Sequence, residues 1–301
     1  MTKFLIIGAN GFFGTNLLQI RNNEKIKKLG FNLFAADLNS SNIPPEVPFY
    51  NLDIVNGQKT KRIIKKINPD IVILTAAKSD VDGCETNKEL ATQINVNGTK
   101  NVLIACEKIK TKLFFLSTDF IFDGISKKGN YNEDDVPNPL NHYGFTKYQA
   151  EKVIYNSKIE FCICRAAVLY GWNPLKLNFI TWILSKLEQN QKITVVTTQF
   201  NNPTFIVNLA QILLKLIEKG ATDIYHTAGI ESLNKYEMAI KCAEFFDFDK
   251  NLIIPVENVK QIAIRPKNVG LDISKLEKLI SSELKIYNLY DGLNDMKQNK
   301  I

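Results

Sequence analysis

The stretch Lys3-Phe-Leu-Ile-Ile-Gly8-Ala-Asn-Gly11-Phe-Phe-Gly14 decides the predicted fold. Residues Lys3–Ile7 form a continuous apolar strand, and a helical pattern over Phe12–Ile20 follows directly. Gly8 permits a tight turn, Gly11 lets a pyrophosphate approach the backbone, and Gly14 lets helix and strand pack closely. The first N–H groups of such a helix are free to bind an anion. This turn therefore predicts a dinucleotide-binding site at the start of the chain.

The same alternation of strands and helices continues through the first half of the sequence. The predicted strands are Phe31–Ala36, Pro48–Leu52, Ile71–Thr75, Lys112–Ser117 and Glu160–Val168, and the predicted helices are Lys59–Ile67, Lys88–Ile109 and Tyr143–Asn156. Strands that are apolar on both faces and separated by helices indicate a parallel sheet covered on both sides. We predict an α/β fold with a Rossmann-type doubly wound parallel sheet.

The regularity weakens after Gly171, and the second half reads as a smaller C-terminal α+β lobe. Helices are predicted at Phe179–Leu187, Val207–Glu218, Tyr236–Phe246 and Ser274–Ile280, with strands at Ile193–Val196 and Ile224–Thr227. We predict a dinucleotide-binding domain over residues 1–170. Residues 171–301 are predicted to be mainly a substrate-binding lobe, with some elements returning to the sheet. The polar stretch 123–141 is predicted to be a long loop, and such loops usually serve function.

Composition narrows the class of protein. The chain has 45% hydrophobic residues and a net charge of +7, and none of its apolar runs is long enough for a membrane helix. The lysines are scattered without interleaved aromatic residues, so we expect neither nucleic acid nor a membrane as partner. The five cysteines fit buried thiols in a reducing, cytoplasmic compartment. With His142 and His226 isolated, no metal site is predicted.

Asp37 lies at the end of the second predicted strand, 23 residues after Gly14. A carboxylate in this place accepts hydrogen bonds from the ribose hydroxyls of a dinucleotide and repels a 2′-phosphate. Residues 38–50 contain neither arginine nor lysine. We therefore expect NAD(H) or NADP(H), with NAD favoured. The alternative role for Asp37 is a helix or turn cap.

Tyr143 and Lys147 form a Y-x-x-x-K pair at the start of a predicted helix. A spacing of four places both side chains on one helix face, where the ammonium lowers the pKa of the tyrosine hydroxyl. Such a tyrosine can exchange a proton with a carbonyl or alcohol oxygen. A second pair, Tyr148–Lys152, faces elsewhere, and packing is its expected role. Thr118 ends a predicted strand, where its hydroxyl can bind the same substrate oxygen.

Taken together, these segments resemble the extended short-chain dehydrogenases/reductases, and within them the dTDP-4-dehydrorhamnose reductase branch. The resemblance rests on Ser117-Thr-Asp-Phe-Ile-Phe-Asp-Gly124, on Pro137-Asn-Pro-Leu-Asn-His-Tyr-Gly-Phe-Thr-Lys147 and on Arg265-Pro266, and it covers nearly the whole chain. It implies a catalytic set of Thr118, Tyr143 and Lys147. The residues that it implies for cofactor binding are Gly8, Asn10, Gly11, Phe12, Phe13, Gly14, Asp37, Asp53, Ile54, Ala76, Ala77, Lys78, Asn95, Tyr143 and Lys147.

Three positions depart from the pattern of this branch. Phe120 and Lys78 stand where tyrosine is usual or frequent, and Val168 stands where tryptophan is frequent. A site built around a hydroxyl discriminates less well without it. The departures therefore weaken the assignment of rhamnose as the sugar, whereas the assignment to the superfamily is unchanged.

The expected activity is NAD(P)H-dependent reduction of the C4 ketone of a nucleotide-linked 4-keto-6-deoxy sugar, such as dTDP-4-dehydrorhamnose to dTDP-rhamnose. One alternative is an NAD-dependent sugar-nucleotide epimerase or dehydratase. Another is a non-catalytic regulatory subunit similar to the β-subunit of methionine adenosyltransferase. From the resemblance we expect either a monomer or a homodimer.

Overall fold

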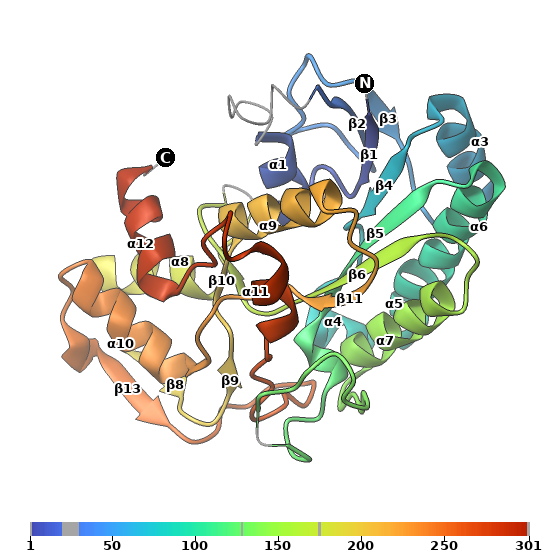
Figure 1. The fold of residues 1–301 in the computed structure, drawn as a ribbon. Helices are drawn as coiled ribbons and strands as arrows, with labels where there is room; N and C mark the ends of the chain where they lie inside the picture. Colours follow the sequence, from blue (N-terminus) through green and yellow to red (C-terminus); the bar gives the residue numbers. More distant parts are fainter. Residues whose placement is uncertain (1, 20–29, 128, 174–175, 300–301) are drawn as a thin grey trace. The chain divides into compact units, whose positions relative to one another are not determined.

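The computed structural model describes residues 2–19, 30–127, 129–173 and 176–299 (Figure 1). Its central sheet has seven strands within this described part. In spatial order they are β11 (Asp223–His226), β6 (Phe161–Ala166), β5 (Lys112–Thr118), β4 (Ile71–Leu74), β1 (Lys3–Ile7), β2 (Asn32–Asp37) and β3 (Phe49–Asn51). β1 pairs in parallel with both β2 and β4, so the strand order reverses beside it. In open α/β sheets, ligands bind at the carboxyl ends of the strands at such a reversal.

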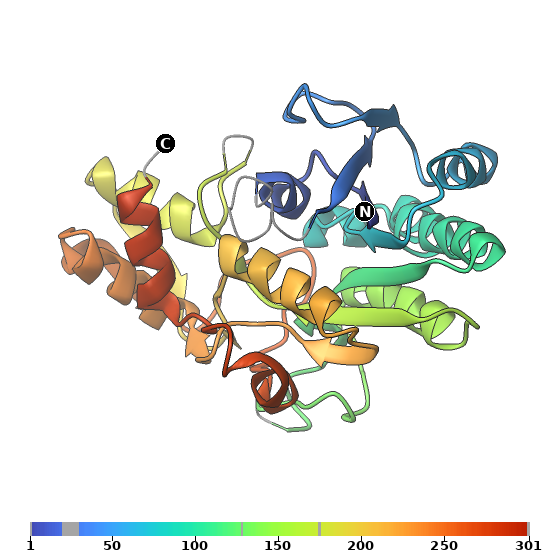
Figure 2. The same cartoon turned by 45° about the horizontal axis from the view of Figure 1, so that its top comes forward.

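The strands are buried because helices cover the sheet. The described α-helices of the first half of the chain are α1 (Phe12–Gln19), α3 (Gly57–Ile67), α4 (Val81–Thr86), α5 (Lys88–Thr92), α6 (Thr99–Ile109) and α7 (His142–Tyr155). In Figure 2, α3, α6 and α7 lie on one face of the sheet and α1 on the other. Phe4 through Ile7 are at most 1% exposed, as expected for a strand with two apolar faces. The predicted Rossmann-type sheet is confirmed.

Helix α3 shows how the sequence sets the bounds of these elements. The side chain of Asn56 accepts a hydrogen bond from the Lys59 N–H and caps the first turn, and Asn68 ends the helix in a left-handed conformation (φ 48°). Its apolar side, with Ile63, Ile64 and Ile67, packs into the hydrophobic core between the helix and the sheet. Burial of this face, and not helix propensity alone, stabilises the helix. Ile20, the predicted last residue of the first helix, lies outside the described residues.

The prediction of one continuous α-helix over Lys88–Ile109 is wrong. The chain forms α5, then a π-helix, η2 (Gln93–Gly98), and then α6. A π-helix accommodates an extra residue in its turn and is often found at functional sites. The apolar period of the sequence hides it, because the residues that face the core remain apolar on both sides of the interruption.

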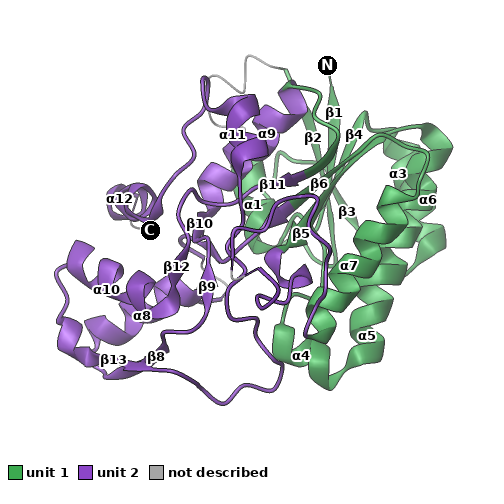
Figure 3. Cartoon of the chain, turned by 60° about the horizontal axis from the view of Figure 1, so that its bottom comes forward, with its two compact units in different colours: residues 1–118, 141–164, 219–224 green, residues 119–140, 165–218, 225–301 purple. Residues whose placement is uncertain are grey.

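The chain divides into two compact units, shown in green and purple in Figure 3. Unit 1 comprises residues 1–118, 141–164 and 219–224, and unit 2 comprises residues 119–140, 165–218 and 225–301. The elements of unit 2 outside the central sheet are η3 (Asp119–Ile121), β7 (Leu169–Tyr170), α8 (Phe179–Glu188), β8 (Ile193–Val196), β9 (Phe200–Asn201), β10 (Thr204–Phe205), α9 (Ile206–Glu218), β12 (Leu233–Asn234), α10 (Lys235–Phe245), η4 (Lys250–Leu252), β13 (Ile253–Val256), α11 (Ser274–Ile280) and α12 (Leu289–Gln298). The domain division predicted at residue 170 stays a prediction.

Unit 2 has an apolar core of its own. Tyr170 is fully buried there, and its hydroxyl donates to the Leu289 carbonyl oxygen over 3.2 Å. β6 ends at Ala166, two residues before the predicted end, and Val168 has a φ of 37° that is incompatible with a strand. No helix among the described residues combines the length and apolar character that a bilayer crossing requires.

Candidate active site

The glycine-rich turn after β1 has no room for a side chain at Gly8 and Gly14, but it has room for one at Gly11. Gly8 has a φ of 92°, and a Cβ there would lie 2.4 Å from the Ala76 backbone nitrogen. A Cβ on Gly14 would lie 2.2 Å from the Gly8 carbonyl oxygen. Gly11 is exposed, and a Cβ there would meet only the Gly8 oxygen, at 3.3 Å. Gly8 and Gly14 thus serve packing, while Gly11 is exposed, and the binding of a dinucleotide at this turn stays a prediction.

The first turn of α1 has the donors that an anion needs. Within the described part of the chain, the N–H groups of Phe12 and Phe13 have no hydrogen-bond partner. The Phe13 side chain is 4% exposed and packs inward, so only its backbone is free to meet a dinucleotide. Free N–H groups at a helix start favour phosphate. The residues of this turn therefore fit the pyrophosphate of a dinucleotide.

Asp37 connects the end of β2 to the glycine turn. Its Oδ2 accepts a hydrogen bond from the Asn10 N–H (2.8 Å) and its Oδ1 accepts one from the Leu38 N–H (2.7 Å). The Asn10 side chain does not point freely toward a ligand, because it hydrogen-bonds with Asn39 and Asn42. The carboxylate is half-buried and keeps acceptor capacity for ribose hydroxyls.

Asp53 and Ile54 lie after β3. The Asp53 carboxylate is exposed and accepts a hydrogen bond from the Val55 N–H (2.9 Å), which caps the turn. Ile54 is buried and contacts Gly98 of η2, where a Cβ would lie 2.6 Å from the Ile54 Cδ1. In the structure, both residues shape the turn, and their role in cofactor binding stays a prediction.

Asn95 holds two predicted site segments together. This residue of η2 is 2% exposed, and its Oδ1 accepts a hydrogen bond from the Lys78 N–H over 2.8 Å. Its Nδ2 donates to the Lys78 carbonyl oxygen and to the Thr146 Oγ1 of α7. The segment after β4, with Ala76 and Ala77, is thereby fixed against the helix that contains Tyr143. Asn95 acts on the site through these contacts.

Helix α7 begins at a well-capped turn. The Asn141 side chain accepts a hydrogen bond from the Gly144 N–H, and the Glu85 carboxylate accepts one from the His142 N–H (both 2.9 Å). The His142 Nε2 lies 2.9 Å from the Lys88 carbonyl oxygen, which fixes the ring against α5. Tyr143 is partly exposed and lies between His142 and Gly144, whose N–H groups make these two capping contacts. These contacts fix the backbone of Tyr143 at the start of the helix.

Lys147 is 4% exposed, and its ammonium lies against the end of β5. The Nζ donates a hydrogen bond to the Leu116 carbonyl oxygen (2.6 Å) and lies 4.0 Å from the centre of the Phe115 ring. Burial lowers the pKa of Lys147 to about 7, against the opposing charge of Glu151. Thr118 ends the same strand and is 6% exposed. Strand β5 and helix α7 thus bring Thr118 and Lys147 to one edge of the sheet.

The second tyrosine–lysine pair has a different environment. Lys152 is exposed, and its Nζ lies 5.6 Å from the centre of the Tyr148 ring. The pair contrasts with Lys147, whose ammonium is buried at the strand end.

Within unit 2, Asp119 has polar neighbours that the sequence did not single out. Asp119 is 2% exposed and accepts a hydrogen bond from the Asn201 Nδ2 over 2.6 Å. Burial lowers the pKa of Lys235 to about 8, with Asp119 opposing that shift, and the ammonium lies 4.7 Å from the Phe179 ring centre. Asp119 stood in a quoted motif, but no spacing connects it with Asn201 or Lys235.

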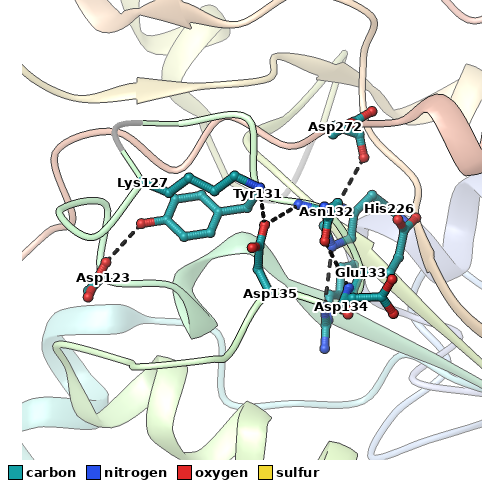
Figure 4. Close-up of polar contacts among 10 residues, drawn as sticks. Asp123, Lys127, Tyr131, Asn132, Glu133, Asp134, Asp135, His226 and Asp272 are labelled. Carbon is teal, nitrogen blue, oxygen red and sulfur yellow. Dashed lines mark hydrogen bonds and ion pairs between the residues drawn. The ribbon is translucent and has the colours of Figure 1, made fainter.

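The predicted loop 123–141 is held by its own side chains (Figure 4). The Tyr131 hydroxyl donates to the Asp123 Oδ1 over 2.8 Å, and the Asn138 Nδ2 donates to the other oxygen over 3.0 Å. The Glu133 carboxylate accepts a hydrogen bond from the His226 N–H over 2.8 Å. The loop is therefore ordered by buried polar contacts within unit 2.

The described residues contain no group of three or more His, Cys, Asp or Glu side chains placed to hold a metal ion. All five cysteines are buried and unpaired, and the Cys162 and Cys164 sulfurs lie 3.9 Å apart on one face of β6.

Comparisons with known proteins identify the family of the chain. Residues 2–297 match the RmlD substrate binding domain family. The chain is 30% identical over 285 residues to methionine adenosyltransferase 2 subunit beta from Xenopus tropicalis, covering 92% of this chain and 82% of that one. It is 28% identical over 291 residues to dTDP-4-dehydrorhamnose reductase from Aggregatibacter actinomycetemcomitans, covering 92% and 93% of the two chains.

Among solved structures, a dTDP-4-dehydrorhamnose reductase from Bacillus anthracis in complex with NADP superposes with a TM-score of 0.87, at 28% identity and over 100% of both chains. The resemblance seen in the sequence motifs is confirmed. The chain belongs to the RmlD substrate binding domain family of the extended short-chain dehydrogenases/reductases.

Proposed function

We propose that this chain is an NAD(P)H-dependent oxidoreductase that reduces the C4 ketone of a nucleotide-linked 4-keto-6-deoxy sugar, with dTDP-4-dehydrorhamnose as the first candidate. The observation that carries the proposal is the buried ammonium of Lys147, four residues after Tyr143 and against the strand that ends at Thr118. The 28% identity to a dTDP-4-dehydrorhamnose reductase over most of the chain supports the same substrate class.

The proposed chemistry follows from three side chains. Tyr143 protonates the oxygen of the ketone as it becomes an alkoxide. Lys147 places a positive charge on the same helix face and stabilises the phenolate that is left. Thr118 donates a hydrogen bond that orients the carbonyl. General acid catalysis of this kind contributes about 10²–10⁴-fold to the rate.

The reduced nicotinamide supplies the hydride when it is bound. The open backbone at Gly11 and the free N–H groups of Phe12 and Phe13 are suited to its pyrophosphate. Asp37 supports NADH over NADPH, because its carboxylate would lie beside a 2′-phosphate. The Bacillus anthracis relative was solved with NADP, so the preference needs a direct test.

The test follows absorbance at 340 nm with the purified protein, NADH or NADPH, and dTDP-4-keto-rhamnose formed in the cuvette. The proposal expects oxidation that depends on both the sugar and the protein. Binding of dinucleotide without oxidation would reject the rhamnose precursor as substrate. A panel of other nucleotide-linked keto-sugars then decides between another substrate and no turnover.

A second candidate function has its own observation. The chain is 30% identical to methionine adenosyltransferase 2 subunit beta over 92% of its length. We therefore also consider a regulatory subunit that keeps the dinucleotide fold. A stable complex with a methionine adenosyltransferase, together with no turnover of any keto-sugar tested, would favour this function. Turnover that requires Tyr143 would favour the enzyme.

A further inference from the structure

Lys235, the first residue of α10, has a half-buried ammonium with no hydrogen-bond or ion-pair partner among the described residues. Its backbone N–H donates to the Gln199 carbonyl oxygen over 3.2 Å, and its Nζ lies 4.7 Å from the centre of the Phe179 ring. The Nζ keeps accessible surface, because it is not one of the fully buried polar atoms that lack a partner. Charges taken out of water are normally paired. An ammonium without an acceptor therefore indicates a place for an anion.

A second lysine of the same helix shows what a structural lysine looks like in this protein. The Lys241 Nζ lies 3.0 Å from the Glu231 Oε2 and 5.0 Å from the centre of the Tyr290 ring. Both lysines thus lie near an aromatic ring, but Lys241 has a carboxylate to neutralise it and Lys235 has none within the described part of the chain. The ring contact of Lys235 therefore does not compensate for its partial removal from water.

Asp119 does not serve as the missing partner. It is 2% exposed, and its Oδ2 accepts a hydrogen bond from the Asn201 Nδ2 over 2.6 Å. Its charge favours the protonated form of Lys235, yet burial has the larger effect and lowers the pKa of Lys235 to about 8. Lys235 is therefore still charged at neutral pH, and its three N–H donors are available on the accessible side.

The chemistry of the ammonium selects the ligand. An ammonium is a point charge that only donates hydrogen bonds, so it suits the oxygens of phosphate groups. The proposed substrate, a nucleotide-linked sugar, contains a diphosphate. Its other part, the neutral keto-sugar, has no anion to offer. The pyrophosphate of the dinucleotide is already matched by the turn at Gly11, which belongs to unit 1. The ammonium of unit 2 is thus left for the substrate.

We infer that Lys235 is a substrate-binding residue whose ammonium binds the diphosphate of a nucleotide-linked sugar. This inference rests on the proposed function in one respect, namely that the ligand is a sugar nucleotide. The ammonium lacks an anion in the free protein and gains one when the diphosphate binds. Lys235 therefore lowers the stability of the free protein and raises its affinity for the substrate.

Lys241 provides a matched control on the same helix. Lys235→Met removes an ammonium without a partner, so the free variant should unfold at the wild-type temperature or above it. Lys241→Met removes the ion pair with Glu231 and should gain no stability. Thermal unfolding of the two free variants gives the comparison. A midpoint of Lys235→Met below that of Lys241→Met would assign the Lys235 ammonium to the fold and overturn the inference.

The decisive experiment measures dissociation constants by titration calorimetry for dTDP and UDP, with NADH present at saturation so that the dinucleotide turn is occupied. Lys235→Met should weaken the diphosphate that the wild type binds by about 10- to 100-fold, as for the loss of a charged hydrogen bond. Its affinity for NADH, titrated separately, should equal that of the wild type. Lys241→Met should bind all ligands normally. Lys235→Arg keeps the charge and should retain most of the affinity, which also covers poor folding of the methionine variant.

Equal affinity of Lys235→Met and wild type for the diphosphate would overturn the inference, and so would an equal loss of NADH affinity, which would indicate a distorted protein. Failure of the proposed function has a different signature. If the wild type reduces no keto-sugar while Lys235→Met still weakens the diphosphate, the reaction is rejected and the contact stands. If the wild type reduces a keto-sugar and Lys235→Met leaves its KM unchanged, the reaction stands and the contact is rejected. A wild type that binds neither diphosphate overturns the inference.

Discussion

The ammonium nitrogen of Lys147 on α7 donates a 2.6 Å hydrogen bond to the carbonyl oxygen of Leu116 on β5. This single contact joins the tyrosine–lysine helix to the strand that ends at Thr118. It also buries a cation, and the lowered pKa of Lys147 follows from that burial. Burial of this ammonium costs stability, because it removes the charged group from water.

The first prediction separates the two tyrosines. Tyr143→Phe should lower turnover of a keto-sugar by about two decades or more, because the proton donor is lost. Its affinity for dinucleotide should stay within a few-fold of the wild type. Tyr148→Phe is the matched control and should leave turnover near normal. Rate constants at 340 nm decide, and a Tyr143→Phe enzyme of nearly wild-type rate would reject the mechanism.

The second prediction concerns pH and stability. The pKa of Lys147 is about 7 in the folded protein and 10.5 in its unperturbed state, so the folded chain binds fewer protons between these values. Stability due to this residue must therefore rise as the pH increases from about 7 toward 10. Between pH 7 and pH 9 the gain is on the order of 2 kcal/mol.

Urea unfolding of the wild type and of Lys147→Met at both pH values measures this gain. The methionine fills the same space without a charge, so its stability should change less between the two pH values. An identical pH dependence in both proteins would contradict the burial of a titrating ammonium.

The third prediction compares two glycines of the same turn. Gly14→Ala should destabilise the protein severely, because its Cβ would lie 2.2 Å from the Gly8 carbonyl oxygen. In Gly11→Ala the added Cβ would lie 3.3 Å from the Gly8 carbonyl oxygen, so the fold should be retained. The affinity for dinucleotide should fall, because the methyl group would occupy the space next to the exposed Gly11 backbone. Thermal unfolding and NADH titration of both variants check this. A stable Gly14→Ala would refute the packing.

The fourth prediction tests the cofactor preference. Asp37→Asn removes the charge that repels a 2′-phosphate, so the ratio of NADPH to NADH affinity should rise by about tenfold, as for a single lost charge on a half-buried side chain. The absolute affinity for NADH should fall, because ribose hydroxyls lose a charged acceptor. Dissociation constants for both cofactors are measured. Parallel changes for both cofactors would show that Asp37 only organises the loop through Asn10 and Leu38.

The fifth prediction addresses the clamp formed by Asn95. Asn95→Leu removes three hydrogen bonds and leaves the Lys78 backbone and the Thr146 hydroxyl short of partners, which should cost about 2–4 kcal/mol of unfolding free energy. Thr146→Val removes one of these bonds and also the bond from the Thr146 hydroxyl to the Tyr143 carbonyl oxygen, and it should cost about 1–2 kcal/mol. Chemical denaturation of both variants gives the comparison. Equal costs would show that the contact to α7 dominates.

Much of the fold follows from local sequence. The apolar run Lys3–Ile7 and the three glycines after it predict the first βα turn, because only glycine tolerates the φ of 92° at Gly8 and the close approach at Gly14. The spacing of Tyr143 and Lys147 predicts a shared helix face. Periodicity did not reveal the π-helix at Asn95, since the residue faces inward and its partners Lys78 and Thr146 are distant in the chain.

The sequence by itself predicted most strands and helices around the central sheet, the glycine-rich turn after β1 and a helix that begins near Tyr143, because each of these depends on neighbours within a few residues. Only the tertiary structure decided that the Lys147 ammonium is buried against Leu116 while Lys152 stays exposed, and that Ser117 alone on β5 has an unsatisfied hydroxyl among the described residues. The physical reason is that burial and hydrogen-bond satisfaction depend on which strand and helix pack together, and no local spacing contains that information.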